Sequence, residues 1–480
     1  MNLHLLNRAA FGPALTQLPD LTKTSPQHLF NTLLQQSSKT PEPFNGIDPD
    51  LIDTVNDMMM KGKGSKKNSD SAAKKTIREK NRDSIKQLNL FWLNNMITAE
   101  DQLREKMTLF WHGHFACRSM NAIHQQALLN VVRANAMGSF RELLIAVSKS
   151  GAILNFLNNN QNRKNHPNEN FAREVMELFT LGRGNYTEQD IKEAARAFTG
   201  WGTDVTGTFV FRKQQHDDGS KTVIGKTGNF TGDDVLNMLL EQKQTALFIT
   251  QKIYRFFVND QPDDEIIRSL AEKFFLSDYS ITILVKNIFT ADWFYEQRNI
   301  GVKIKSPIEL LVGIQRILPM EIQNQNALLQ LQRILGQVLL YPPNVAGWPG
   351  GKNWIDSSTL MMRMRIPRLV CDDDILNVKP KDDDDQMMGR KDDTDEMAMV
   401  KQRKAAVKLL NASIDWGKYT AYFSATPKDE LLATVTGILF SANSKIPDQL
   451  IKQYTDISNR QDFIKTATMR LMSLPEYQLC

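Results

Sequence analysis

Residues 168–182 carry charged side chains whose types and spacing could support chemistry. Four apolar residues recur at the i, i+4, i+7 and i+8 positions of one helix face, which predicts a buried stripe. The opposite face holds acid, base and acid four residues apart, namely Glu169, Arg173 and Glu177. Glu174 lies on the flank between the faces. Glu174 and Glu177 are therefore candidate catalytic carboxylates, and Arg173 could orient a polar ligand. A surface salt-bridge ladder or a buried structural network would give the same pattern.

Two histidines, His112 and His114, flank Gly113. Imidazole is a common metal ligand, so both are candidate ligands. Residues two apart on a continuous helix point about 200° apart, so a shared ion requires the helix to break at the glycine. His114 also continues the apolar stripe of the preceding segment. That position favours a hydrogen-bonded core histidine as the alternative.

A loop at residues 216–221 offers an imidazole, two carboxylates and a lysine. His216 and Asp217 are candidate metal ligands, and Lys221 is a candidate ligand-binding cation. The spacing does not match an EF-hand loop, so calcium is not indicated. The simplest alternative is a turn at Asp218-Gly219 with a solvated lysine.

A metal site would require these segments to converge in the fold. If the 216–221 loop lies over the 168–182 helix, oxygen and nitrogen ligands for a divalent metal ion could gather there. The ligand set would be His112, His114, His216 and Asp217, with Glu174 or Glu177 as the base.

Residues 341–354 form a segment rich in proline, glycine and tryptophan. Proline fixes φ and glycine allows close backbone approach, so a rigid irregular loop is predicted. Trp348 could stack on a sugar or another planar ligand. A plug for the hydrophobic core is the equally weighted alternative.

The elements that position these residues are mostly helical. Start signals at Thr98, Thr187-Asp190 and Thr231-Asp234 predict helix N-termini. Further helices are predicted over 245–258, 264–275, 281–294, 307–318 and 328–340, and through the tail to residue 474. Residues 207–211 and 222–225 predict the two strands of one β-hairpin within 205–226. The fold class is therefore mostly α, a large single helical domain with a small β-hairpin insertion.

Composition divides the chain further. Residues 57–83 are rich in lysine and 372–404 in aspartate, which predicts two disordered charged insertions in a body of residues 1–371. Residues 405–480 are predicted to add C-terminal helices to the same core. The formal charge of +5 gives no strong case for nucleic acid or membrane partners. Three separated cysteines exclude a disulfide framework.

No run is long and apolar enough to predict a membrane span. Residues 1–12 lack the apolar stretch of a signal peptide, so a soluble, cytoplasmic protein is expected, an interpretation that leaves export open.

Several stretches occur in order over nearly the whole chain: residues 6–12, 110–115, 168–182, 186–190, 199–201, 216–221, 305–307 and 342–351. Together they resemble a large bacterial family known as domain of unknown function 1800. The resemblance implies a mostly helical domain without an established activity. It also implies a sulfatase-like partner, because genes for such proteins often lie beside those of relatives. Many relatives have His where this chain has Phe179.

Three functions compete at this point. The first is a binding or accessory protein that acts with a partner through a polar pocket, whose binding residues would include Arg173, Lys221 and Trp348. The second is a metal-assisted hydrolase. The third is nucleic-acid binding through the basic tract, which the near-neutral overall charge disfavours.

Overall fold

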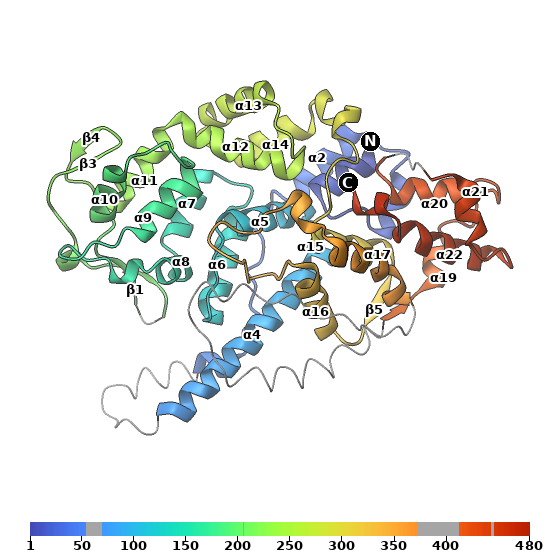
Figure 1. Cartoon of the computed structure of the whole chain (residues 1–480), viewed down its shortest axis with the longest axis horizontal. Coiled ribbons are helices and arrows are strands. Elements are labelled where there is room, and N and C mark those ends of the chain that lie inside the picture. Colours follow the sequence, from blue (N-terminus) through green and yellow to red (C-terminus); the bar gives the residue numbers. More distant parts are fainter. Residues whose placement is uncertain (54–69, 205, 372–411, 443–445) are drawn as a thin grey trace.

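The computed structural model describes residues 1–53, 70–204, 206–371, 412–442 and 446–480. Helices dominate, and the strands form three two-stranded sheets within these residues (Figure 1). The predicted mostly α fold is confirmed. No helix in these ranges is long and apolar enough to cross a lipid bilayer.

The first part of the chain is helical, and most of its helices contribute to a large apolar cluster. The helices of this part are α1 (Asn2–Ala9), α2 (Pro26–Gln36), α4 (Asp70–Thr98), α5 (Gln102–His114), α6 (Ala122–Asn135), α7 (Phe140–Ser148), α8 (Gly151–Phe156), α9 (Asn170–Glu174) and α10 (Glu188–Ala197). A π-helical turn, η3 (Val175–Thr180), continues α9.

The second half continues with α11 (Gly232–Glu241), α12 (Lys243–Phe257), α13 (Asp264–Leu276), α14 (Ile281–Phe289), α15 (Pro307–Ile317), α16 (Asn326–Leu335), α17 (Ser357–Cys371), α19 (Trp416–Ala421), α20 (Leu431–Leu439), α21 (Asp448–Gln453) and α22 (Arg460–Met472). Short 3₁₀ turns lie at η1 (Leu15–Asp20), η2 (Asn159–Gln161), η4 (Lys213–Gln215), η5 (Asp292–Tyr295), η6 (Gln297–Asn299), η7 (Gly351–Trp354) and η9 (Pro475–Gln478).

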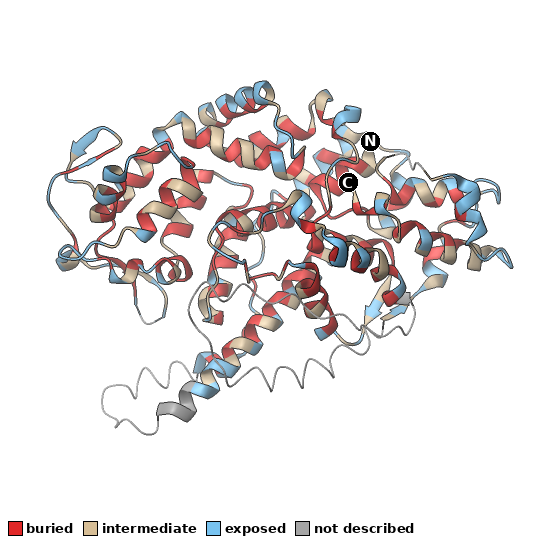
Figure 2. Cartoon of the chain, viewed as in Figure 1, coloured by how far each residue is buried: buried red, intermediate tan, exposed pale blue. Residues whose placement is uncertain are grey.

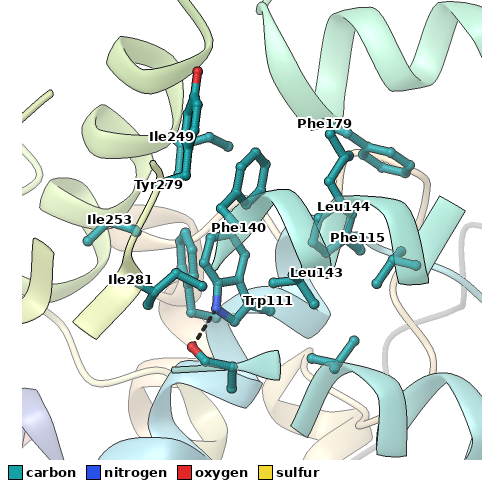
Figure 3. Close-up of a cluster of buried hydrophobic side chains, with 14 of the residues drawn as sticks. Trp111, Phe115, Phe140, Leu143, Leu144, Phe179, Ile249, Ile253, Tyr279 and Ile281 are labelled. Carbon is teal, nitrogen blue, oxygen red and sulfur yellow. Dashed lines mark hydrogen bonds between the residues drawn. The ribbon is translucent and has the colours of Figure 1, made fainter. Parts of the chain in front are cut away.

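Trp111 on α5 lies in the centre of the first apolar cluster. Its ring stacks on Phe140 of α7 at 5.4 Å, and its Nε1 donates to the Ala136 carbonyl at 3.1 Å (Figure 3). Because the indole N–H is paired, the whole side chain can be buried without an unsatisfied donor. Phe179 of η3 and Ile249 of α12 belong to the same cluster. The cluster therefore fixes α5, α7, η3 and α12 relative to one another.

Two of the three predicted start signals are capping boxes. Thr187 with Asp190 begins α10, and Thr231 with Asp234 begins α11. The third prediction was wrong, because Thr98 is the last residue of α4 and its hydroxyl donates back to the Asn94 carbonyl. Helix α5 begins four residues later, at Gln102.

Helix α4 corrects the predicted basic insertion. Residues 70–83 are its first turns, whereas 54–69 and the predicted acidic insertion lie outside the described residues. The later part of α4 buries Leu88, Trp92 and Met96, and Figure 2 shows burial increasing along it. Once that stripe fixes the helix, good helix formers such as lysine, arginine and glutamate extend it outward.

The predicted hairpin is two hairpins with different partners. Strand β2 (Phe209–Phe211) pairs back to β1 (Trp201–Thr203), and β3 (Lys221–Val223) pairs with β4 (Lys226–Gly228). Ile224 and Gly225 both have positive φ, as a two-residue turn of the hairpin type requires. The predicted pairing of 207–211 with 222–225 was therefore wrong.

The C-terminal helices pack against α15, α16 and α17. They form a second apolar cluster that includes Leu311 of α15 and Val435 of α20. Strand β5 (Met320–Ile322) pairs with β6 (Ala412–Ile414) beside it. A third cluster joins α4 to α5, α6, α15 and α16. Figure 1 places both labelled chain ends beside this half of the molecule.

Two predicted helices are shorter than expected. Helix α14 ends at Phe289, and a 3₁₀ turn replaces its predicted last turn. Helix α16 ends at Leu335 because Gly336 adopts a left-handed conformation (φ +86°), the usual glycine stop.

Candidate functional site

The two histidines of α5 have separate surroundings. The Nε2 of His112 accepts from the Leu340 N–H at 3.2 Å, and its ring packs against Trp92 and Trp348. His114 instead contacts the Phe179 carbonyl and the Lys252 amine. Burial lowers the pKa of His112 to about 4 and that of His114 as well. Both are buried and hydrogen-bonded, which the core alternative predicted for His114.

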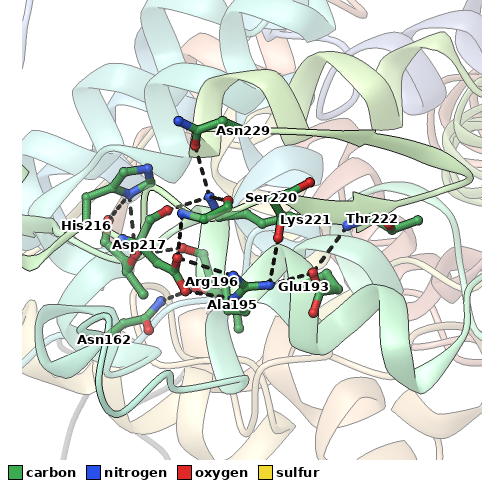
Figure 4. A network of polar contacts seen from close by, with 12 residues as sticks. Asn162, Glu193, Ala195, Arg196, His216, Asp217, Ser220, Lys221, Thr222 and Asn229 are labelled. Carbon is green, nitrogen blue, oxygen red and sulfur yellow. Dashed lines mark hydrogen bonds and ion pairs between the residues drawn. The ribbon is translucent and has the colours of Figure 1, made fainter.

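His216 and Asp217 belong to a polar network, the hairpin network, that joins the loop before β3 to α10 (Figure 4). The Nδ1 of His216 lies 2.9 Å from the Thr199 carbonyl. Asp217 binds Arg196 with a shortest distance of 2.7 Å, and this hydrogen bond lowers the pKa of the carboxyl. Arg196 also pairs with Glu193. The imidazole and the carboxylate are thus engaged with protein groups.

Lys221 completes the hairpin network. It is fully buried, and its amine donates to the carbonyls of Asp217 and Gly219 and to Asn229. Burial lowers the pKa of this amine. The prediction that Lys221 binds a ligand stays untested, but these three acceptors already occupy its hydrogen-bonding capacity.

The charged face of α9 is a ladder of ion pairs. Arg173 pairs with Glu169 and with Glu188 of α10, all well exposed. Glu177 accepts from the Tyr186 hydroxyl and from Arg183. Burial, with the neighbouring Glu177 charge, raises the pKa of Glu174. The roles of Glu174 and Glu177 as catalytic groups and of Arg173 in binding stay predictions.

The predicted metal centre is not assembled. Among the residues described, no group of three His, Cys, Asp or Glu side chains could hold a metal ion. His112, His114, His216 and Asp217 face three different sets of partners, on the 339–348 segment, on η3 with α12, and on α10. The predicted convergence was wrong because each group satisfies its hydrogen bonds within its own part of the fold.

The loop at 341–354 packs against the end of α5. Gly347 (φ +81°) lies so close to the Gly113 carbonyl that a Cβ there would be 2.3 Å from the oxygen. Trp348, half-buried, packs on the His112 ring at 5.6 Å. This contact favours the core-plug alternative for Trp348, and its proposed stacking on a ligand is untested.

A pocket that the sequence did not predict lies between α1, α15 and the C-terminal residues. It is small and partly open to solvent, with a cavity volume of about 20 Å³ that suits a ligand of a few atoms. Lys305, Glu309 and Asn7 give it polar walls, and Phe11, Ile317 and Tyr477 belong to its apolar walls. We call it the Lys305 pocket. Residues 6–12 and 305–307, which carry part of the family resemblance, contribute to its lining.

Glu309 and Lys106 form a buried ion pair beside the pocket. The Lys106 amine also donates to the Ala10 carbonyl at 2.9 Å, and Glu309 accepts from the Ser306 N–H at the start of α15. Burial opposes ionisation of Glu309. Attraction and hydrogen bonding by Lys106 and Ser306 outweigh it and lower the pKa of Glu309 to about 2.

Lys305 lacks such a partner. Its ammonium lies 3.9 Å from the centroid of the Tyr477 ring, and no described residue accepts a hydrogen bond from it. The residue is only 7% exposed. Burial lowers the pKa of Lys305 to about 8, although charges at Cys480 and Glu309 act in the other direction.

Two further cations are buried in this region. Arg8 donates to three backbone carbonyls, and Arg363 donates to the Lys305 carbonyl and to Gln478. Burial lowers the pKa of both, while charges at Glu309 and Cys480 raise it. The Nη1 of Arg363 has no hydrogen-bond partner among the described residues. Positive charge therefore exceeds negative charge around the pocket.

The family model described as "Protein of unknown function (DUF1800)" matches residues 4–479. No curated protein and no solved structure matches the chain.

Proposed function

We propose that this chain, a member of the DUF1800 family of proteins of unknown function, is a binding protein that takes a small anion in the Lys305 pocket. The observation that carries the proposal is the Lys305 ammonium, which contributes to the pocket lining without a hydrogen-bond acceptor. Buried polar groups in native proteins are nearly always satisfied, so an unsatisfied cation beside a pocket favours a missing anionic partner.

The charge around the pocket supports an anion. Four cations, Arg8, Lys106, Lys305 and Arg363, are buried in this region. The carboxylates that act on them are Glu309, which is paired with Lys106, and Asp260, which is paired with Lys303. Burying an uncompensated cation is costly, and a bound anion would recover part of that cost.

The pocket walls narrow the class of anion. Lys305 gives a single cationic end, whereas Phe11, Ile317 and Leu439 give apolar surface. A ligand with one charged group and a short apolar body matches both. We therefore propose a small carboxylate, such as a short-chain acid, over an inorganic anion.

The proposed role as an accessory to a sulfatase-like partner rests on the family resemblance alone. Anion binding by the isolated chain can be tested without it.

Isothermal titration calorimetry of the full chain with acetate, butyrate, hexanoate, phosphate and sulfate at pH 7 tests the proposal. We expect a short-chain carboxylate to bind most tightly and Lys305→Gln to weaken it at least tenfold. Lys352→Gln removes the same charge from an exposed residue and should leave binding unchanged. Equal affinity of Lys305→Gln and the wild-type chain, or no heat with any of the five anions, would overturn the proposal.

A further inference from the structure

Two turns with exposed side chains lie side by side next to the β1–β2 hairpin. Within residues 163–166, the His166 N–H donates to the Arg163 carbonyl at 2.8 Å. The Lys164 N–H donates to the carbonyl of Gln215, the last residue of η4, at 2.9 Å. Because this backbone hydrogen bond joins the 163–166 turn to η4, the exposed side chains of both turns belong to one surface.

Four cations lie on this surface, which we call the basic surface. Three of them are exposed and the last is half-buried: Arg163, Lys164, Lys213 and Arg212. Arg212 donates from its Nη2 to the Thr203 carbonyl of β1 at 2.5 Å, which fixes the guanidinium beside the hairpin. Among the described residues, no acid forms an ion pair with any of the four. Their charges are therefore available to a partner.

The acids near the basic surface are too few to neutralise it. Residues 155–168 contain no acid, and Asp217 is paired with Arg196. The remaining exposed acids nearby are Asp204 and Asp218, against four cations. The formal charge of the whole chain is only +5, but attraction of a polyanion depends on the local field, which is positive here.

An exposed aromatic ring adjoins the cations. Phe211 is the last residue of β2 and is 41% exposed. Its ring contacts the His216 ring edge-on, with the centroids 5.2 Å apart, and Arg212 and Lys213 follow it directly in the chain. Cations beside an exposed ring are the combination that binds single-stranded nucleic acids, because cations contact phosphates while the ring stacks on a base.

We propose that the basic surface binds single-stranded nucleic acid, a function independent of anion binding in the Lys305 pocket. The four cations contact phosphates, and Phe211 stacks on an unpaired base. A duplex is disfavoured because its bases are already stacked on one another. Stacking tolerates every base, so single strands are expected to bind with little sequence preference.

Two other polyanions match the basic surface less well. An acidic protein segment matches the charge but gives the exposed Phe211 ring no role. An anionic membrane is usually bound by several inserted apolar side chains together with cations. Among the described residues between 121 and 275, Phe211 is the only large apolar side chain that is exposed.

Fluorescence anisotropy of the full chain with a labelled thymidine oligonucleotide of about 12 residues tests the proposal. The combined variant Arg163→Gln, Lys164→Gln and Lys213→Gln should bind at least tenfold more weakly than the wild-type chain at about 100 mM salt. The slope of log affinity against log salt should also become shallower by about 2, because each lost phosphate contact contributes roughly 0.7.

A matched triple variant controls for net charge. Lys243→Gln, Lys273→Gln and Lys286→Gln remove three exposed lysines from α12, α13 and α14. We expect affinity within twofold of the wild-type value and an unchanged salt slope. Equal losses in the two triple variants, or no binding by the wild-type chain, would overturn the proposal.

Substitutions of Phe211 separate stacking from apolar contact. Phe211→Leu keeps an apolar side chain without a ring and should weaken oligonucleotide binding about fivefold, whereas Phe211→Trp should bind at least as tightly as the wild-type chain. Equal affinities of the two variants would contradict stacking. Polyglutamate and phosphatidylserine vesicles are titrated in parallel, and tighter wild-type binding to either of them than to the oligonucleotide would overturn the assignment to nucleic acid.

Discussion

The hairpin network and the Lys305 pocket differ in whether the amine of their buried lysine has hydrogen-bond acceptors. In the hairpin network, Lys221 is fully buried and donates to three acceptors, and Arg196 pairs with two carboxylates. In the pocket, Lys305 is nearly as buried, and its ammonium contacts the Tyr477 ring but has no hydrogen-bond acceptor among the described residues. The difference teaches that residue type alone does not mark a binding site. The segment with the richest set of reactive side chains is satisfied internally, and the unsatisfied charge lies elsewhere.

The largest effect is expected at the Lys106–Glu309 ion pair beside the pocket. Glu309→Gln leaves Lys106 buried without its counter-ion, and we expect a loss of about 3 to 5 kcal/mol in the free energy of unfolding at pH 7, measured by urea denaturation. The pKa of Glu309 is lowered to about 2, so this stabilisation is present above its unfolded value near 4.5 and is lost as pH falls from 4.5 to 2. A loss below 1 kcal/mol would show that the pair is not buried as described.

Opposite signs are expected for the two buried lysines. Lys221→Met leaves three acceptors unpaired and should destabilise the protein by about 1 to 3 kcal/mol. Lys305→Met removes an uncompensated charge and should stabilise the ligand-free protein by roughly 1 to 3 kcal/mol at pH 7. The same sign in both variants would abolish the contrast between the two regions.

The gain from Lys305→Met should depend on pH. The pKa of Lys305 is lowered to about 8 in the folded protein, below its unfolded value near 10.5. The penalty for burying the charge is therefore complete below pH 8 and disappears as pH rises from 8 to 10.5. Denaturation of the wild-type chain and of the variant at pH 7 and pH 10.5 measures this, and a gain that is equal at both values would contradict it.

A smaller loss is expected for Asp217→Asn. Its carboxylate is partly exposed, at 18%, and the amide keeps some hydrogen bonding to Arg196. We expect about 1 kcal/mol of destabilisation and unchanged anion affinity. Reduced anion affinity in calorimetry would show that the hairpin network influences the pocket, and the contrast between the two regions would then be wrong.

The smallest effect is expected for Arg173→Ala. Its ion pairs with Glu169 and Glu188 are exposed, and such pairs contribute a few tenths of a kcal/mol. The midpoint of urea denaturation should change little. A loss above 1 kcal/mol would show that the ladder is part of the core structure.

The sequence predicted the features that local rules determine. The capping boxes at Thr187 and Thr231 lie within four residues of chain, so each could be recognised directly. The start of α4 was missed because its turns have no apolar stripe of their own and depend on burial further along the helix. The strand pairing was missed because β1 pairs with β2 and β3 with β4, so each strand pairs with its nearest neighbour in the sequence.

The site was predicted less well than the fold. Metal ligation was inferred from residue types, but hydrogen bonds over long sequence distances, such as Leu340 to His112, decide what each imidazole does. The Lys305 pocket joins Asn7 to a residue almost three hundred positions later, and no spacing rule connects them. Lys305 lies within residues 305–307, one of the stretches that resemble the family. That resemblance was the sequence signal that could have pointed to the pocket.

A crystal structure of the full chain with the tightest-binding carboxylate tests the central claim most directly. We expect electron density for the ligand in the Lys305 pocket, with a carboxylate oxygen about 3 Å from the Lys305 Nζ and the aliphatic body against Phe11 and Ile317. Density for water alone in the pocket, with the carboxylate bound at another surface, would contradict the assignment of this pocket as the anion site.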